Sequence, residues 1–391
     1  MFYLNQLGMV CPLGENHAEI SRRLFAGDSG VGMTALCSPG RELALGCVET
    51  LLPDLSTLPL GQRSRNNQLA LAALAQIRPE VDAAIRRFGP ERVAVVLGTS
   101  TSGIGQSEAA FRHRLESQRF PADFDYAQQE MASPAATLAS VLGVIGPAYV
   151  HSSACASSSK AMASAARLIK MGLCDAVLTG GVDSLCAFTV AGFGALESVS
   201  AARCNPFSAN RNGINIGEGA ALFLMSKVEA AVSLRGWGES SDGYHISAPD
   251  PSGAGARSAM EQAMARAGVA PAQVDYINLH GTATVQNDAM EGQVVGAMFA
   301  DHVALSSTKP FTGHALGAAG AVEAGLCWLA MQDDNPLGRL PPHLWDGVGD
   351  PGLPQLNLAP VGARLGHPLR WALSNSFAFG GANASLLLGR E

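Results

Sequence analysis

Short apolar runs, most of them closed by glycine or a small polar residue, recur along the chain and predict buried β-strands. Alanine-rich segments between them repeat their apolar residues at helical spacing and predict helices over 67–89, 158–173 and 258–269. Because strands and helices alternate, we expect an α/β fold with largely parallel central strands. The predicted strands lie at 92–98, 148–154, 175–181, 220–226, 275–281, 303–309 and 370–376.

An internal echo suggests that the chain has two similar halves. The segments VVLGTSTS at 95–102 and INLHGTATV at 277–285 both show a strand pattern followed by Gly-Thr-small-Thr. We therefore expect an N-terminal half at 1–233 and a C-terminal half at 234–391. The polar, glycine-rich stretch at 235–255 is the predicted junction between the halves, or a loop over a site.

Composition and charge narrow the function classes. The 391 residues carry 33 acidic and 26 basic side chains, a formal charge of −7, which argues against a nucleic-acid partner. With 47% hydrophobic residues the chain can fill real cores, so disorder is excluded as its main state. Residues 131–159 lack charged side chains, but Pro134 and Pro147 interrupt them, which favours buried elements over a membrane span.

The cysteine pattern and the N-terminal sequence predict the cellular compartment. The eight cysteines form no C-x-x-C pair, and the chain is too long to need disulfide staples. We expect reduced thiols in a cytoplasmic compartment. No basic residue precedes Arg22 in the apolar N-terminal stretch, so no signal peptide is expected.

Several familiar chemistries have no motif in the sequence. There is no G-x-S-x-G elbow, no Gly-Lys pair of a phosphate loop and no complete G-x-G-x-x-G fingerprint. The histidines include no H-x-x-x-H pair, and no cysteine stands at ligand spacing from another. We expect no metal and no nucleotide cofactor.

Cys155 stands out by its position. It ends the strand-like YVHSSA and opens a helical segment, so free backbone N–H groups and the helix dipole are expected to face its sulfur. Such a position lowers a thiol pKa and supplies donors for an oxyanion. The competing interpretation is a small buried hydrophobic residue, which is the usual fate of a cysteine.

Two histidines follow predicted strands in the same way. His280 and His314 each lie beside glycines that let a ligand approach the backbone, and strand ends are where α/β folds place their chemistry. Lys309 precedes His314 in a segment without another charge until Glu323. We predict that Lys309 is buried and paired to Glu323. The alternatives are polar histidines at helix starts and a solvated surface lysine.

Six segments, spread in order over almost the whole chain, resemble the signature blocks of the β-ketoacyl-acyl carrier protein synthases of types I and II. The resemblance implies a thiolase fold, with two pseudo-equivalent halves stacked as α-β-α-β-α layers and dimers formed edge to edge. It also implies decarboxylative condensation of an acyl-enzyme thioester with malonyl-acyl carrier protein, without a metal or redox cofactor. The blocks are SSACASSSKA, CNPFSANRNGINIGEGAALFLMSK, SSDGYHISAPD, YINLHGTATVQNDAMEG, LSSTKPFTGHALGAAGAVEAG and SNSFAFGGANASLLLG.

The resemblance assigns a catalytic role to each of five residues. Cys155 matches the nucleophile that accepts the acyl group, and His280 and His314 match the two catalytic histidines. Lys309 and Glu323 match the charged pair that supports them.

It also assigns the groups around the substrate. Thr282 and Thr284 match the threonines that hold the phosphopantetheine arm, and the backbone amides of Cys155 and Phe379 match the oxyanion hole. Phe377 and Phe379 lie in the gating loop.

Two positions depart from the family pattern. Ala378 stands where the gating loop usually has glycine, which removes backbone freedom from that loop. Asn287 replaces the usual glycine before Asp288, so the position of that turn is less closely defined.

Two other functions share the fold. A non-decarboxylating thiolase is expected to carry a second cysteine near its C-terminal glycine-rich loop, and SNSFAFGGANAS has none. A chain-length-factor partner, with a binding and structural role, is expected to lack the nucleophile, and Cys155 is present.

Partners and pathway are further expectations. FYLNQLGMVCPLGEN and RSRNNQLALAALAQI resemble bacterial ketosynthases of aryl polyene synthesis, which often work beside a catalytically silent ketosynthase-like chain. Homodimer and heterodimer both stay open. Because carrier proteins are acidic and this chain is net negative, docking needs a local basic patch. Its predicted members are Arg63, Arg65, Arg203 and Arg211.

Overall fold

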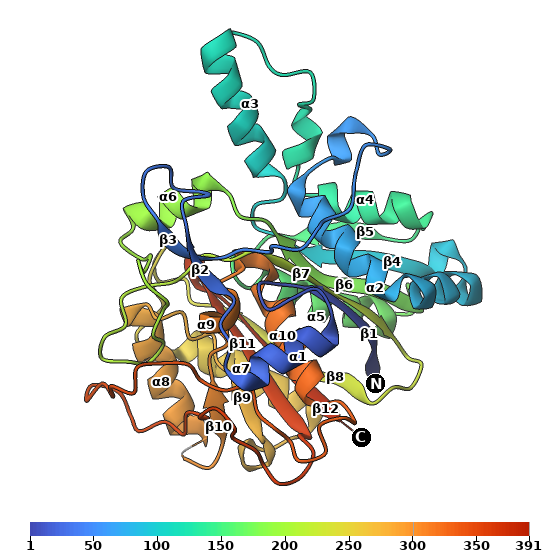
Figure 1. The fold of residues 1–391 in the computed structure, drawn as a ribbon. Helices are drawn as coiled ribbons and strands as arrows, with labels where there is room; N and C mark the ends of the chain where they lie inside the picture. The colour runs from blue at the N-terminus through green and yellow to red at the C-terminus, as the bar shows by residue number, and fades with distance from the viewer. Residues whose placement is uncertain (300, 391) are drawn as a thin grey trace.

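The computed structural model describes residues 1–299 and 301–390, and its strands form two copies of one pattern (Figure 1). Within these residues, one continuous mixed sheet has the order β10-β9-β11-β12-β8-β1-β7-β6-β4-β5. Read outward from the β1–β8 contact, each half has the same order, so the echo in the sequence reflects a structural repeat. The N-terminal strands are β1 (Phe2–Val10), β4 (Val93–Gly98), β5 (Ala148–His151), β6 (Ala176–Asp183) and β7 (Gly219–Ser226).

The C-terminal half repeats this arrangement with β8 to β12. In each half three neighbouring strands are parallel, β5, β4 and β6 or β10, β9 and β11, and the other two are antiparallel. The expectation of parallel central strands therefore holds for these triplets alone. The strands are β8 (Val232–Ser241), β9 (Tyr276–Asn278), β10 (Ala304–Ser306), β11 (Trp371–Ala378) and β12 (Ala382–Arg390).

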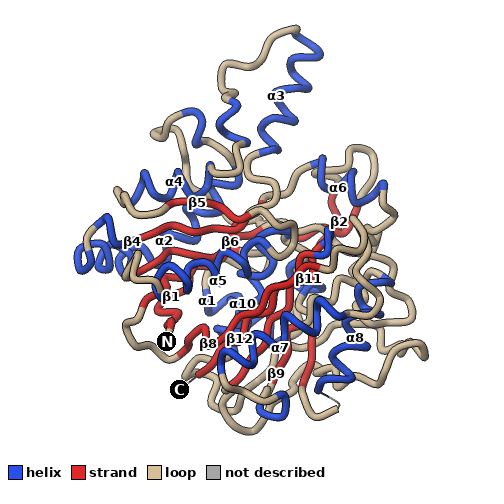
Figure 2. The backbone as a smooth tube through the Cα atoms, turned by 180° about the vertical axis from the view of Figure 1, so that it is seen from behind, coloured by secondary structure: helices blue, strands red, loops and turns tan. Residues whose placement is uncertain are grey.

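Helices cover both faces of each half-sheet and give the expected five layers. The helices α2 and α4 pack on the outer face of the N-terminal strands, and α7 packs on β8 and β12 of the other half. Between the halves, α5 and α10 contact strands of both and each other (Figure 2). The bounds are α2 (Arg65–Phe88), α4 (Ser133–Leu142), α5 (Ser157–Lys170), α7 (Ala254–Ala267), α8 (Val285–Phe299) and α10 (Ala319–Ala330).

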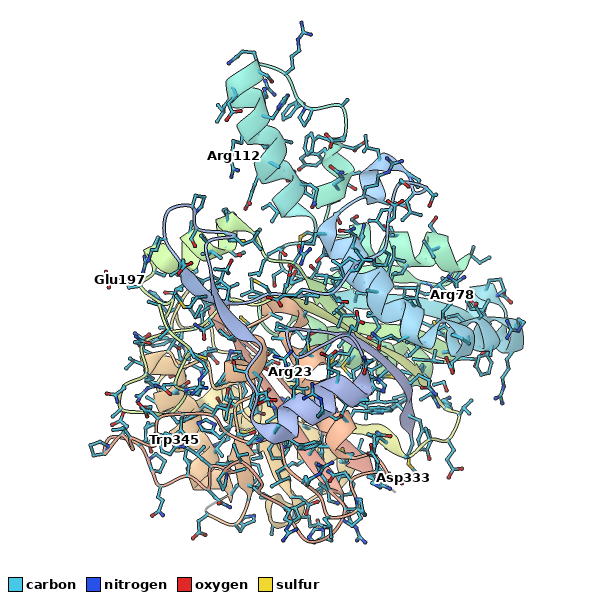
Figure 3. All side chains as sticks on the ribbon, in the orientation of Figure 1. Arg23, Arg78, Arg112, Glu197, Asp333 and Trp345 are labelled. Atoms are coloured by element: carbon cyan, nitrogen blue, oxygen red, sulfur yellow. The ribbon has the colours of Figure 1, made fainter. Side chains whose placement is uncertain are left out.

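Shorter strands and helices lie outside this layered core. The strands β2 (Val31–Thr34) and β3 (Leu43–Gly46) form a separate antiparallel pair. Helix α3 projects from the body as an arm, and Figure 3 shows Arg112 on it, away from the layers. Within the described residues, no helix is long and apolar enough to cross a membrane. The remaining helices are α1 (His17–Ala26), α3 (Ile104–Ser117), α6 (Ala187–Ala195) and α9 (Lys309–Thr312).

The three predicted helices and seven predicted strands are present, with β5, β9 and β10 shorter than expected. The predicted junction 235–255 contains three parts: 235–241 belong to β8, 242–253 form a loop, and 254–255 begin α7. Because Gly236 and Gly238 are typical of loops, the sequence pattern did not predict strand β8. A Cβ at either glycine would overlap a backbone carbonyl of α7, so these glycines let helix and strand pack closely.

Candidate active site

Three residues from distant parts of the chain meet at the seam between the halves. Cys155 lies between the end of β5 and the start of α5, His280 follows β9, and His314 follows α9. Because the carboxyl ends of the parallel strands lead toward this seam, the sheet order brings these residues together. All three side chains are buried, with 2–4% of their surface exposed.

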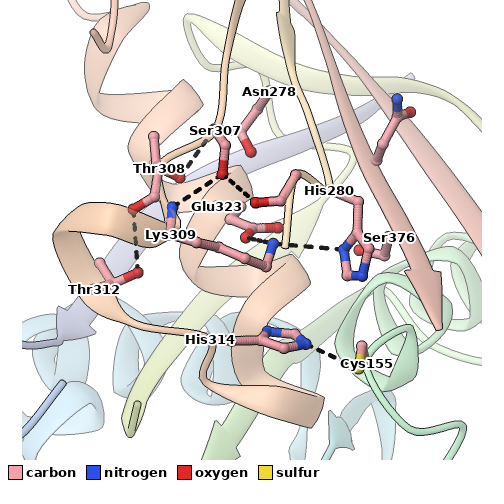
Figure 4. A network of polar contacts seen from close by, with 12 residues as sticks. Cys155, Asn278, His280, Ser307, Thr308, Lys309, Thr312, His314, Glu323 and Ser376 are labelled. Carbon is pink, nitrogen blue, oxygen red and sulfur yellow. Dashed lines mark hydrogen bonds and ion pairs between the residues drawn. The ribbon is translucent and has the colours of Figure 1, made fainter. Parts of the chain in front are cut away.

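The three side chains are within contact distance of one another. His314 Nε2 lies 2.9 Å from Cys155 Sγ, and the two imidazole rings have centroids 5.4 Å apart (Figure 4). One nitrogen of each histidine and the sulfur lie within 4.8 Å of one another, a spacing that also suits a metal ion. The ammonium of Lys309, 3.5 Å from His280 Nδ1, opposes a second cation there.

Lys309 is buried and forms an ion pair with Glu323, as predicted. Its ammonium can only donate, so His280 Nδ1 accepts and the proton of a neutral His280 lies on Nε2. Burial, followed by the charge of Lys309, holds the pKa of His280 and of His314 well below 6.5. Both rings are therefore neutral imidazoles that can donate an N–H to a substrate oxygen.

The expectation of a lowered Cys155 pKa is wrong for this site. Burial raises the pKa of the thiol to about 11, although the charge of Lys309 and the backbone N–H of Phe379 act in the opposite direction. The sequence indicated the nearby helix start but not the depth of burial, and burial disfavours the charged thiolate. The amides of Phe379 and Cys155 do face the sulfur, where the oxyanion hole was expected.

A narrow cavity leads to the sulfur. Thr282 and Thr284 line it with hydroxyl oxygens 2.9 Å apart, and Phe377 and Phe379 line it beside Cys155. All the expected substrate-side residues thus line one cavity. Sequence reasoning missed other lining residues, because their segments reach the cavity only through tertiary packing; they include Phe193, Ser198, Ile214, Ser247, Pro249 and Gln286.

The two departures from the family pattern are accommodated. Ala378 has φ −92° and ψ 154°, an extended conformation that suits any residue, while Gly380 and Gly381 supply the positive φ angles of this turn. Asn287 lies inside α8, and its amide donates to the carboxylate of Asp288. Neither substitution distorts the backbone that lines the cavity.

Two arginines of the predicted docking patch have partners inside the chain. Arg65 donates two hydrogen bonds, of 2.5 and 2.8 Å, to the fully buried Glu218. Arg211 is buried and pairs with Asp350 at 2.5 Å. Arg211 is therefore internal to the fold, and its assignment to a docking surface is corrected. Arg65 keeps 35% of its side chain exposed, and its docking role stays a prediction.

The remaining two, Arg63 and Arg203, are exposed. Both keep the surface position that the prediction requires.

A buried thiol beside two neutral imidazoles, at the seam of a duplicated five-layered fold, defines a thiolase-fold enzyme that transfers acyl groups. Comparison with family models agrees. Residues 62–231 match the beta-ketoacyl synthase N-terminal domain, and residues 231–344 match the C-terminal domain.

Known proteins resemble the chain over most or nearly all of its length. Nodulation protein E of Rhizobium meliloti strain 1021 is 32% identical over 97% of this chain and 96% of its own length. The 3-oxoacyl-[acyl-carrier-protein] synthase 2 of the same strain is 38% identical over 63% of this chain and 61% of its own. The ketosynthase ApeO of Xenorhabdus doucetiae, solved in complex with its chain length factor ApeC, is 43% identical with a TM-score of 0.94, covering 100% of this chain and 98% of its own.

The chain therefore belongs to the beta-ketoacyl synthase family. It is an acyltransferase that condenses an acyl thioester with malonyl-acyl carrier protein, in type II fatty acid or polyketide-like synthesis.

Proposed function

We propose that Cys155 accepts the acyl group and that His280 and His314 stabilise the charge that develops on malonyl thioester. The observation that supports this proposal is that the sulfur and one nitrogen of each histidine lie within 4.8 Å of one another, and all three residues line one cavity. Acyl transfer forms a thioester on Cys155, and the thiol proton passes to the released carrier thiolate, so the step needs no external base.

The second half-reaction uses the neutral rings. Malonyl thioester loses carbon dioxide, and the electron pair of the broken C–C bond becomes an enolate whose oxygen accepts from His280 and His314. The enolate carbon attacks the acyl carbonyl on Cys155. The carbonyl oxygen takes the negative charge beside the amides of Cys155 and Phe379, and the thiolate leaves.

No step of this scheme moves electrons to a redox group, and imidazole and backbone N–H donors stabilise the developing negative charge, so the scheme uses neither a redox cofactor nor a metal. The test is turnover of desalted enzyme in chelator without nicotinamide. Loss of turnover that zinc restores would instead assign the three ligand-type atoms to a metal.

The proposed pathway is the synthesis of aryl polyenes. The N-terminal segments resemble ketosynthases of that branch, and ApeO is 43% identical over the whole chain. Three phenylalanines line the cavity: Phe193 and Phe379, whose ring centroids lie 5.4 Å apart, and Phe377. Their rings suit a flat conjugated chain. The relevant substrates are then aryl-polyenoyl groups on acyl carrier protein.

The proposed partner is a ketosynthase-like chain length factor. The N-terminal half-sheet ends at β5, whose outer edge has no strand beside it among the described residues, and such an edge can pair with another strand. The arm α3 also exposes large apolar side chains, with Phe111 51% and Leu115 78% exposed. ApeO was solved with such a partner.

These surfaces allow a homodimer as the alternative. Native mass after co-expression with a ketosynthase-like chain that lacks the cysteine separates the two. A one-to-one complex supports the proposal, and a homodimer that ignores the second chain contradicts it.

The reaction is tested with malonyl-acyl carrier protein and a panel of saturated and aryl-polyenoyl carrier proteins, read by intact mass. We expect two-carbon extension, with the aryl-polyenoyl substrates preferred. Equal or better extension of saturated chains would contradict the pathway while leaving the condensation reaction intact. A cysteine-directed ketosynthase inhibitor such as cerulenin should give one adduct that maps to Cys155. We place the enzyme in the cytoplasm, since all eight cysteines are free thiols, as a reducing compartment requires.

A further inference from the structure

The carboxylate of Asp183, at the end of β6, is fully buried at the seam between the halves. Its Oδ1 accepts from the hydroxyl of Thr99 at 2.5 Å and from both the N–H and the hydroxyl of Thr101, at 3.0 and 2.8 Å. The N–H of Ser100 lies 2.9 Å from both oxygens. The N–H of Gly317 donates to Oδ2 at 2.6 Å. One side chain therefore binds two backbone segments from different halves.

Each of these segments leads directly to a reacting side chain. The hydroxyl of Ser100 donates to the carbonyl of Ala154 at 3.1 Å, and Ala154 precedes Cys155. Gly317 lies three residues after His314. The hydrogen bonds thus run without a gap from the residue before the sulfur, through one carboxylate, to the loop that carries the imidazole.

The backbone at both ends is held in an unfavourable conformation. Ala154 and Leu316 both have φ +47°, in the left-handed region that residues with a Cβ rarely adopt. Gly317 permits the close contact, because a Cβ there would lie only 2.6 Å from Ser100 N and 2.7 Å from an oxygen of Asp183. A conformation of this kind persists only where surrounding contacts fix it.

We propose that Asp183 is a positioning residue that sets the sulfur of Cys155 against His314 Nε2, at the observed 2.9 Å. The motif GTSTS, which the sequence shows but no catalytic role explains, is then the part of the N-terminal half that binds this carboxylate. The proposal concerns the geometry of the site and holds for any acyl chain or pathway.

The donor pattern indicates how to disturb this arrangement. Every group that faces Asp183 donates, so a carboxylate, which only accepts, satisfies all of them. Asp183→Asn replaces one oxygen with an NH2 group and sets donor against donor, either at Gly317 or at the loop 99–101. The variant keeps the size of the side chain, so the seam stays filled.

The first measurement is alkylation of Cys155 by iodoacetamide as a function of pH, followed on the peptide that contains this cysteine. Displacing His314 removes a polar partner from a buried sulfur, so between pH 7 and 9 the Asp183→Asn profile should move up by about one pH unit, which is an alkylation rate about tenfold lower at a given pH. The second is condensation kinetics. We expect kcat to fall about 10- to 100-fold and the KM for malonyl-acyl carrier protein to change less than about twofold.

The matched control is Asp275→Asn. This carboxylate also accepts from two backbone amides, of Arg370 and Trp371 at 2.9 Å, but next to the start of β9 and β11, whereas His280 follows the end of β9. We expect it to lower the thermal midpoint without moving the alkylation profile. If Asp183→Asn behaves in the same way, with kcat per folded molecule within about twofold of wild type, the side chain only supports the fold and the proposal fails.

A smaller change keeps the test decisive if Asp183→Asn does not fold. Ser100→Ala removes only the hydroxyl bond to Ala154 and keeps the Ser100 N–H on the carboxylate. We expect the same upward shift of the alkylation profile between pH 7 and 9, with a kcat loss of about threefold. An unshifted profile in folded Ser100→Ala would overturn the proposed link to the sulfur.

Discussion

The two halves use the same sheet order for different tasks. In the N-terminal half, the loop after β4 binds Asp183 through Ser100 and Thr101, and its hydroxyl groups face the seam. In the C-terminal half, the loop after β9 binds the buried Glu291 through the N–H groups of His280 and Gly281, both at 2.8 Å. That second loop carries His280 into the cavity, whereas the first carries no residue that lines it.

This difference separates what the fold supplies from what the reaction needs. In both copies a buried carboxylate accepts hydrogen bonds from backbone amides that follow a strand, so both halves share this arrangement. Catalytic side chains occupy only one copy of the loop, and the N-terminal half contributes its sulfur from the next strand, β5. The site is therefore complete only when both halves are held in register across the seam.

The largest expected effects test whether the N-terminal half carries out acyl transfer and the C-terminal half carries out decarboxylation. Cys155→Ala should abolish formation of the acyl-enzyme, because no other group at the seam replaces the sulfur. His280→Ala and His314→Ala should still become acylated but lose about 10²- to 10³-fold in decarboxylation and condensation, because each removes a donor to the enolate oxygen. Intact mass follows acylation, and carbon dioxide release follows decarboxylation. A histidine variant that decarboxylates normally but cannot be acylated would show that the division is wrong.

The next effect concerns the ion pair of the C-terminal half. Lys309→Ala leaves the carboxylate of Glu323 buried without its partner, which costs about 3–5 kcal/mol in the free energy of unfolding. Urea unfolding measures this cost. The double variant Lys309→Met with Glu323→Leu removes both charges and should recover most of the stability while decarboxylation stays impaired. Unchanged stability in Lys309→Ala would mean that the ammonium reaches water.

Local sequence patterns were sufficient for much of the fold and for the three reacting residues. Helix α2 repeats its buried positions at helical spacing, and strand β4, a continuous apolar run in the sequence, is buried at every position. Cys155, His280 and His314 each follow a strand pattern beside small residues. These signals are readable because they depend on neighbours in the chain.

What the sequence could not supply depends on distant contacts. Strand β8 contains Gly236 and Gly238, whose role is visible only once α7 packs against them. The raised pKa of Cys155 comes from burial beneath both halves, and Arg211 finds Asp350 far along the chain. Charge and residue type alone therefore predicted the wrong environment for that thiol and that arginine.

A moderate effect is expected at the docking surface, whose candidates Arg63 and Arg203 both lie in the N-terminal half. Arg63→Glu should slow acylation by acyl-carrier protein about tenfold at low salt and flatten its salt dependence, and Arg203→Glu should add to this. Acylation by acyl-pantetheine, which lacks the protein, should stay unchanged.

The matched control is Arg86→Glu, an equal change of charge at an exposed position near the other end of α2. If it slows acylation as much as Arg63→Glu does, net charge and not a local patch governs the encounter. Equal loss with acyl-pantetheine would mean that Arg63 supports the fold.

The smallest effect is a pH dependence that should come from the C-terminal half. Burial holds the pKa of His280 and His314 well below 6.5, so the folded protein keeps them neutral where the unfolded chain binds protons. Below pH 6.5 the unfolded state therefore gains more protons, and the free energy of unfolding falls by up to about 1 kcal/mol per pH unit for each histidine. The thiol of Cys155, with a pKa of about 11, does not titrate in this range. Urea unfolding between pH 7.5 and 5.5 should show a shallower slope for His280→Ala than for wild type, while His367→Ala, at an exposed position, should match wild type. If the pH dependence of the free energy of unfolding is the same in His280→Ala and in wild type, then this ring is protonated in the folded site as readily as in the unfolded chain. That result would contradict the proposal that a neutral His280 donates to the enolate.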